Sequence, residues 1–128
     1  ICWDWLKGLN AMKLATIINA RESITFAYGL RLKSGARALR LRKTLLALDN
    51  ELKAFDGMRN DYLNGLGKAS LSPGEPGFDT LVKMLSEAAA EDVSVTVEPV
   101  IELDDLESIE VSAKEIDDLV VLGLIRDL

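Results

Sequence analysis

Histidine is absent from this chain of 128 residues, and its one cysteine is Cys2. Without histidine, no imidazole serves as a general base, a proton shuttle or a metal ligand. A single cysteine forms no internal disulfide and provides no thiol-rich zinc site. These absences exclude most familiar enzyme sites, and no other motif in the chain specifies a reaction.

Long apolar runs are missing as well. The run from Leu119 to Ile125 is far shorter than the roughly 20 residues that a membrane-spanning helix needs. The chain holds only 3 prolines and 48% of its residues are apolar, so it has enough apolar side chains for one core. We expect a cytoplasmic protein, because a single cysteine does not form a disulfide framework. We expect one domain, 12–128, because the first methionine is Met12 and residues 1–11 have the character of an upstream or expression-derived tail.

The two halves of the chain carry opposite charge. Residues 1–64 hold 11 basic and 6 acidic side chains, a net charge of +5, whereas residues 65–128 hold 4 and 15, a net charge of −11. Opposite halves attract each other within a fold or across a subunit contact. We therefore expect a basic helical half, 12–67, to pair with an acidic half, 78–128, across the glycine- and proline-rich loop 68–77. A nucleic-acid or basic-protein partner is the alternative.

Apolar spacing predicts a mainly helical chain. Apolar residues three and four positions apart predict helices over 13–28, 36–66 and 78–90. A capping-box pattern at Ser112 begins a short final helix, and Gly123 is expected to end it.

One short strand interrupts the helical pattern in the acidic half. Valines alternate with polar residues over 93–97, and Pro99 ends this strand or places it at a sheet edge. Residues 100–103 and 109–111 are its candidate extended partners. The predicted fold class is α+β, mainly helical, with antiparallel helices, a small C-terminal β element and a short final helix.

The helix over 36–66 carries the clearest pattern in the sequence, a heptad stripe of apolar residues. At 1.5 Å per residue this helix is roughly 46 Å long, which is longer than the other predicted helices can cover. We therefore expect a homo-oligomer, most simply a dimer, in which a second copy covers the remaining stripe. A bend at Gly57 that folds the end back is the alternative. The candidate oligomer contact consists of Leu41, Leu45, Leu48, Leu52 and Phe55.

A dense basic stretch extends from Arg31 to Lys43. Within it, Arg37 and Arg40 share one helix face, which makes them the candidate phosphate-contacting residues of a nucleic-acid-associated regulator. The residues that read bases from a helix-turn-helix are not evident, and the whole chain is acidic. Pairing of these arginines with the acidic half is therefore the favoured interpretation.

Four carboxylates form a candidate acidic patch near the C-terminus. Carboxylate oxygens bind hard cations such as calcium or magnesium, so a metal-dependent enzyme is a third alternative. The loop glycine and final glutamate of an EF-hand are missing, and we favour a solvated acidic turn with no metal, cofactor or catalytic residue. The patch consists of Glu102, Asp104, Asp105 and Glu107.

Short motifs occur in a fixed order from Met12 onward. The N-terminal ones are Met12-Lys13-Leu14, Leu45, Leu48, Glu51-Leu52, Ala54-Phe55 and Arg59, and then Phe78, Leu81 and Leu85. The C-terminal ones are Val93, Val95, Val97, Pro99, Ile101-x-Leu103-x-Asp105-Leu106-Glu107 and Val111-Ser112-x-x-Glu115-Ile116-x-x-Leu119.

Together these motifs resemble a group of short proteins encoded by tailed bacteriophages and prophages. The C-terminal motifs are similar to the group's strand, its "LSDLEG" turn and its "SPADL" helix start, although Ser108 replaces the usual glycine and Ala113 the usual proline. The resemblance implies a mobile-element origin and carries over no catalytic residue. We therefore expect a non-enzymatic interaction or assembly protein with a phage or host protein as its partner, located in the bacterial cytoplasm or on a virion.

Overall fold

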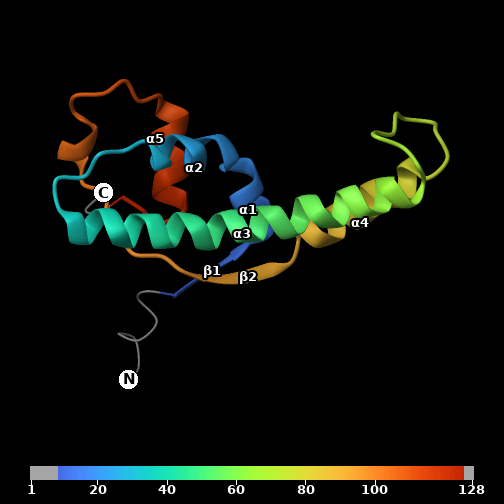
Figure 1. Ribbon diagram of the computed structural model, residues 1–128, viewed down its shortest axis with the longest axis horizontal. Coiled ribbons are helices and arrows are strands. Elements are labelled where there is room, and N and C mark those ends of the chain that lie inside the picture. The colour runs from blue at the N-terminus through green and yellow to red at the C-terminus, as the bar shows by residue number, and fades with distance from the viewer. Residues whose placement is uncertain (1–8, 126–128) are drawn as a thin grey trace.

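The computed structural model describes residues 9–125 and shows a mainly helical α+β fold (Figure 1). The long helix α3 passes along a body made of the other elements and then leaves it beside α4 as a projecting arm. No helix in this part of the chain is long and apolar enough to cross a membrane. The elements in chain order are β1 (Leu9–Lys13), α1 (Leu14–Asn19), α2 (Arg21–Tyr28), α3 (Gly35–Gly65), α4 (Phe78–Ala89), β2 (Asp92–Thr96), the 3-10 helix η2 (Leu103–Leu106) and α5 (Ala113–Val121).

The apolar stripe of α3 anchors this helix in the body. Leu41, Leu45, Leu48 and Leu52 are buried in one core with side chains from α1, α2, β2 and α5, and Phe55 packs against its edge. The prediction that this stripe forms an oligomer contact is therefore wrong for the four leucines, because elements of the same chain cover them. The helix also continues through Gly57 without a break.

The small sheet joins two segments that are far apart in the sequence. β1 pairs antiparallel with β2, with Leu9 opposite Thr96 and Lys13 opposite Asp92. β2 confirms the predicted strand, but its partner includes residues 9–11, which the sequence assigned to a tail. The predicted boundary at Met12 thus lies inside β1, where pairing with β2 extends the folded chain. Residues 1–8 of that tail lie outside the described residues.

The predicted helix over 13–28 is divided at Ala20 into α1 and α2. The two parts have different neighbours: α1 packs on β1, α3 and α4, whereas α2 packs on α3 and α5. Tertiary packing thus divides into two helices a segment whose continuous apolar spacing predicts one. At the other end of the chain, the capping box of α5 is confirmed, with the Ser112 hydroxyl accepting a hydrogen bond from the Glu115 N–H at 3.1 Å.

The segments expected to pair with the strand form no ladder in the described chain. Ile101 makes one isolated parallel bridge with Ile125, and its N–H donates to the carbonyl of Leu124 at 3.0 Å. The next residues form the 3-10 helix η2, where an extended chain was predicted. The Asp105 carboxylate accepts a hydrogen bond from the Glu102 N–H at 2.9 Å and so caps this helical turn.

The arm has a small core of its own. Leu63 of α3 and Leu81 of α4 are buried, yet they lie outside the main core. At the tip, Gly77 begins α4 with φ of +90°, and a Cβ there would lie 3.0 Å from a methyl carbon of Leu66 and 3.1 Å from the hydroxyl oxygen of Tyr62. Backbone geometry and space therefore both require glycine at this turn.

The buried stripe gives a first prediction. Replacing Leu48 with alanine removes a fully buried side chain and should lower the free energy of unfolding by roughly 2–5 kcal/mol. Leu46→Ala on the same helix is the matched control, because Leu46 is exposed, and should change it by less than about 1 kcal/mol. Urea unfolding followed by circular dichroism measures both. Equal effects of the two variants would contradict the placement of the stripe.

Candidate functional site

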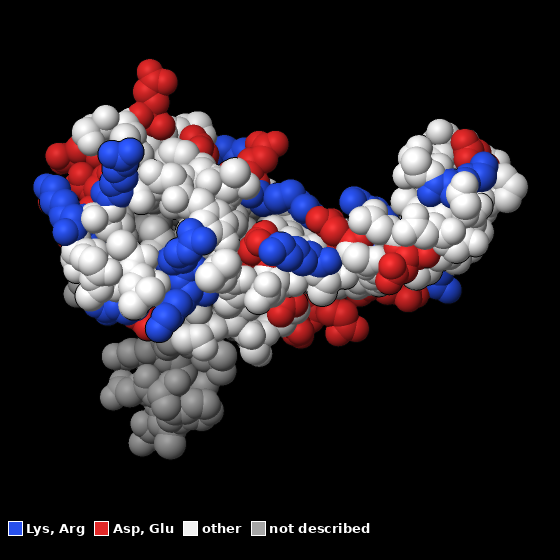
Figure 2. Space-filling view, in the orientation of Figure 1, with Lys and Arg blue, Asp and Glu red and all other residues white. Residues whose placement is uncertain are grey.

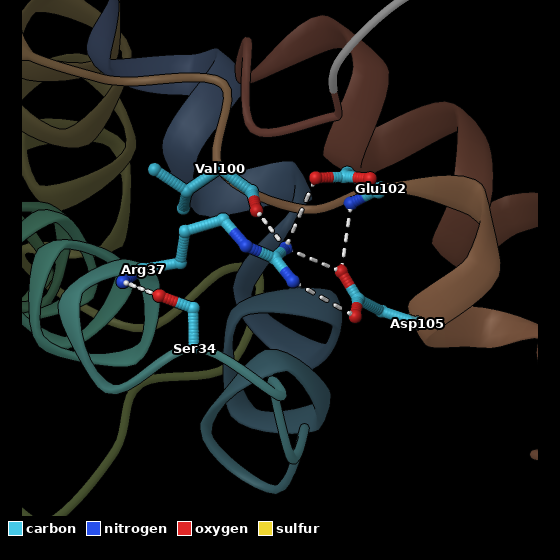
Figure 3. Close-up of polar contacts among 5 residues, drawn as sticks. All are labelled: Ser34, Arg37, Val100, Glu102 and Asp105. Atoms are coloured by element: carbon cyan, nitrogen blue, oxygen red, sulfur yellow. Dashed lines mark hydrogen bonds and ion pairs between the residues drawn. The ribbon is translucent and has the colours of Figure 1, made fainter.

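The least exposed ion pair of the described residues lies where α3 begins (Figure 3). Ser34 caps the helix by accepting a hydrogen bond from the Arg37 N–H at 3.3 Å. The Arg37 guanidinium donates to both carboxylate oxygens of Asp105, at 2.8 and 3.4 Å, and to the carbonyl of Val100 at 2.8 Å. Glu102 lies 3.7 Å from the same nitrogen. We call these contacts the Arg37 latch.

The latch joins the basic half to the acidic half away from solvent. The Arg37 side chain is 17% exposed and that of Asp105 only 3%. Hydrogen bonds from Arg37 lower the pKa of the Asp105 carboxyl below its ordinary value, against the opposing effect of burial. The same hydrogen bonds raise the pKa of Arg37. Both groups therefore stay charged and paired at neutral pH, and the geometry is the bidentate one that makes such pairs strong.

Arg37 pairs with the acidic half, as the favoured interpretation of the sequence predicts, and not with a phosphate as the alternative had it. Its guanidinium donates three hydrogen bonds to Val100 and Asp105, and its side chain is only 17% exposed, so little of it is open to a phosphate. Arg40 remains half-exposed and lies 3.4 Å from Glu98, at the side of a groove of about 330 Å³ between α3 and β2. Arg42 lies 5.7 Å from the ring centre of Tyr28, within cation–π distance. Arg37, Arg40 and Arg42 of the basic stretch thus contact groups of the same chain.

The predicted acidic patch is also divided by the fold. Asp105 is buried in the latch and caps η2, whereas Asp104 and Glu107 face solvent and Glu102 is half-buried. Within residues 9–125, no three carboxylate or cysteine side chains come together in a group that would hold a metal ion. Asp105 and Glu102 therefore differ from the solvated turn that the sequence predicted, because Arg37 from the other half draws them inward.

Two further polar links hold α2, and the sequence pattern did not predict them. The Arg21 guanidinium donates to both oxygens of Asp56, at 2.7 and 3.0 Å, which fixes α2 against α3 where the arm leaves the body. The Asp118 carboxylate accepts from the buried Ser23 hydroxyl and from the Lys114 ammonium, each at 2.7 Å, which fixes α2 against α5. The only sequence signal is the position of Ser23, three residues after Ala20 and four before Ala27, on the otherwise apolar side of this helix.

The arm carries apolar side chains that its two helices do not cover. Leu66 is 44% exposed and Val82 is 43% exposed, and their apolar neighbours along the arm are half-buried. In α3 these side chains share one flank of the helix, by their three- and four-residue spacing. We call this set the arm surface; it consists of Phe55, Met58, Tyr62, Leu66, Phe78, Val82, Met84 and Leu85.

Comparison with protein families, with curated proteins and with solved structures finds no match for this chain. The resemblance to phage and prophage proteins therefore stays a prediction from the sequence. The candidate site rests on the geometry alone, and the arm surface is the set of apolar side chains that the two helices of the arm leave partly exposed.

The latch gives a second prediction. Asp105→Ala removes the charged acceptor of Arg37 and should lower the free energy of unfolding by roughly 1.5–3 kcal/mol. The thermal midpoint should then fall by at least about 5 °C. Asp104→Ala is the matched control, because Asp104 is the exposed neighbouring carboxylate. If both variants have the same thermal midpoint as the unchanged chain, the latch does not stabilise the fold.

Acid should weaken the fold through the same links. Hydrogen bonds from Arg21, Arg37 and Lys114 lower the pKa values of Asp56, Asp105 and Asp118 respectively. A carboxyl group whose pKa is lower in the folded state gives its full stabilisation above its unfolded pKa, and this is lost as the pH falls through the folded pKa.

We therefore expect the free energy of unfolding to decrease as the pH falls below the ordinary aspartate value of 3.8. Urea unfolding at about pH 6 and about pH 3 measures the loss. Asp105→Asn should lose less unfolding free energy between these pH values than the unchanged chain does. The control Asp104→Asn should lose as much as the unchanged chain. An unfolding free energy that is equal at both pH values would refute the role of the three carboxylates.

Proposed function

We propose that this chain is a non-enzymatic interaction protein of phage or mobile-element origin, which acts in assembly by binding a macromolecule through the arm surface. The observation that carries the proposal is the partial exposure of apolar side chains along a projecting pair of helices. The resemblance of the motif order to phage and prophage proteins supports the origin.

A two-helix arm leaves apolar groups in water for a physical reason. Leu63 and Leu81 face inward between the helices, but residues on the flank, such as Leu66 and Val82, have no third helix to cover them. Full burial of such a side chain contributes about 1.5–3 kcal/mol, so several of them provide a substantial free energy for binding. An amphipathic helix laid along the arm is the partner chemistry that fits this surface.

The body supports the arm and leaves the arm surface free. Arg21 and Asp56 fix α2 to α3 at the point where the arm departs, and α4 contacts α1 at the same end. The Arg37 latch holds the beginning of α3. The arm is thus presented on a body that the Arg21–Asp56 link and the Arg37 latch hold against α3.

A nucleic-acid-associated regulator is the alternative, and the geometry favours it less. The latch engages Arg37, while Arg40 and Arg42 lie beside Glu98 and Tyr28. The exposed Arg31, Lys33 and Lys43 remain, and among the described residues none of them forms an ion pair. They give an anion-attracting surface but no residues that read bases.

Site-specific photo-crosslinking tests the proposal. A photoreactive residue at position 82 in the arm surface should give one defined protein adduct in cells that carry the mobile element, and Leu66→Glu should abolish this adduct. A photoreactive residue at Val121, an exposed apolar position on α5, is the matched control. The adduct should be absent from the control, since α5 lies outside the arm.

Two outcomes would count against the arm surface. If position 82 yields no adduct beyond those of position 121, the arm does not bind a partner. If a photoreactive residue at position 43 forms an adduct with nucleic acid and one at position 82 forms none, the chain is better described as a nucleic-acid-associated regulator. Circular dichroism of each variant establishes that the chain is folded.

A further inference from the structure

The groove of about 330 Å³ between α3 and β2 shares no residue with the arm surface. Its helix side includes Lys43, Ala47 and Glu51, and its strand side includes Ser94 and Thr96. β2 belongs to a two-stranded sheet, so only one of its edges is paired within the described chain. In Figure 1 β2 lies beside α3 and runs in the opposite direction.

Main-chain groups of β2 are left over on its unpaired edge. The Leu14 N–H donates to the carbonyl of Glu91 at 2.9 Å, which makes these two residues a hydrogen-bonded pair of the β1–β2 ladder. Such pairs alternate along an antiparallel ladder, so Val95 directs its N–H and C=O groups toward β1. Those of Ser94 and Thr96 therefore point away from β1, and they form no other main-chain hydrogen bond among the described residues.

An extended peptide is the partner that satisfies such an edge. Its N–H and C=O groups are free to bond with those of a strand, whereas a helix already uses its own internally. Ser94 and Thr96 are exposed, so a peptide reaches this edge from solvent. In binding of this kind, main-chain hydrogen bonds provide affinity and side-chain contacts provide specificity.

α3 places two unmatched charges along the other side of the groove. Lys43 and Glu51 lie about one turn before and after Ala47, whose small side chain leaves space between them. Glu51 is half-buried, yet neither charge forms an ion pair within residues 9–125. Figure 2 shows basic side chains over the N-terminal part of α3 and acidic ones farther along toward the arm.

The spacing of these charges matches that of a strand. Glu98, just after β2, lies 3.4 Å from Arg40, so the end of β2 lies beside the beginning of the groove. A strand antiparallel to β2 therefore runs in the direction of α3. Lys43 and Glu51 are eight residues apart, about 12 Å along a helix, and four residues of a strand cover about 14 Å. Strand residues four positions apart also share one face.

We infer that this groove binds an extended peptide, which adds a third strand to the sheet antiparallel to β2. The peptide carries an acidic residue beside Lys43 and, four positions later, a basic residue beside Glu51. The residues between them donate to and accept from the main chain of Thr96 and Ser94. Because the groove and the arm surface are separate, the inference does not depend on the proposed function.

Three labelled synthetic peptides test this site on the full chain by fluorescence anisotropy. All three alternate valine with threonine and are capped at both ends. The first has a glutamate four positions before a lysine, and the second has these two residues exchanged. The third is the first with proline directly after the glutamate, which removes an N–H that would bond to β2.

We expect the first peptide to bind and the other two to have dissociation constants at least about tenfold higher. In hydrogen exchange, the first peptide should slow the exchange of the Ser94 and Thr96 amides, because these become hydrogen-bonded. The double variant Lys43→Glu with Glu51→Lys should instead prefer the second peptide. Lys83→Glu, at an exposed lysine of α4, is the matched control and should leave the preference for the first peptide unchanged.

Several results would overturn the inference. If none of the peptides binds, or all three bind alike, the edge of β2 is not a peptide site. If the double variant still prefers the first peptide, Lys43 and Glu51 do not face the ligand. A dimer by sedimentation equilibrium in which the Ser94 and Thr96 amides are protected without any peptide would give the edge to a second copy. If the double variant does not fold by circular dichroism, Lys43→Gln should reduce the preference between the first two peptides, and an unchanged preference counts against the site.

Discussion

Burial of Leu41, Leu45, Leu48 and Leu52 in a core shared with α1, α2, β2 and α5 is the constraint on which the rest of the structure depends. These leucines fix only part of α3, which continues for 31 residues, roughly 46 Å at 1.5 Å per residue. The remainder extends past the body and has α4 as its main neighbour there. The arm and its partly exposed apolar flank both follow from one helix being longer than the body that holds it.

The separation of charge along the chain keeps that helix in place. The ion pairs of Arg37 with Asp105, of Arg40 with Glu98 and of Lys13 with Asp92 all join the basic half to the acidic half. Exposed pairs of this kind contribute little, so most of the stabilisation comes from the shielded Arg37 latch at the start of α3. The link from Arg21 to Asp56 acts at the other end of the anchored segment, where the arm begins.

Local patterns in the sequence predicted the long helix, α4, the strand at β2 and the capping box at Ser112, because spacing and capping residues act over a few positions. Pairing of the two charged halves also followed from charge alone. Contacts between distant segments did not: the pairing of β1 with β2, the break at Ala20 and the inward turn of Asp105 all depend on which elements meet. The sequence predicted the heptad stripe but gave it a second copy as its packing partner, because the sequence does not reveal that α5 and β2 share its core.

A rigid body that presents a less stable arm is the central claim, and hydrogen exchange of the α3 amides tests it most directly. Amides from Leu41 to Leu52 lie beside the main core and should exchange only through global unfolding, whereas those from Met58 to Gly65 should exchange faster through local opening of the arm. Equal protection along the whole of α3 in the isolated chain would contradict the division of this helix into an anchored segment and an arm.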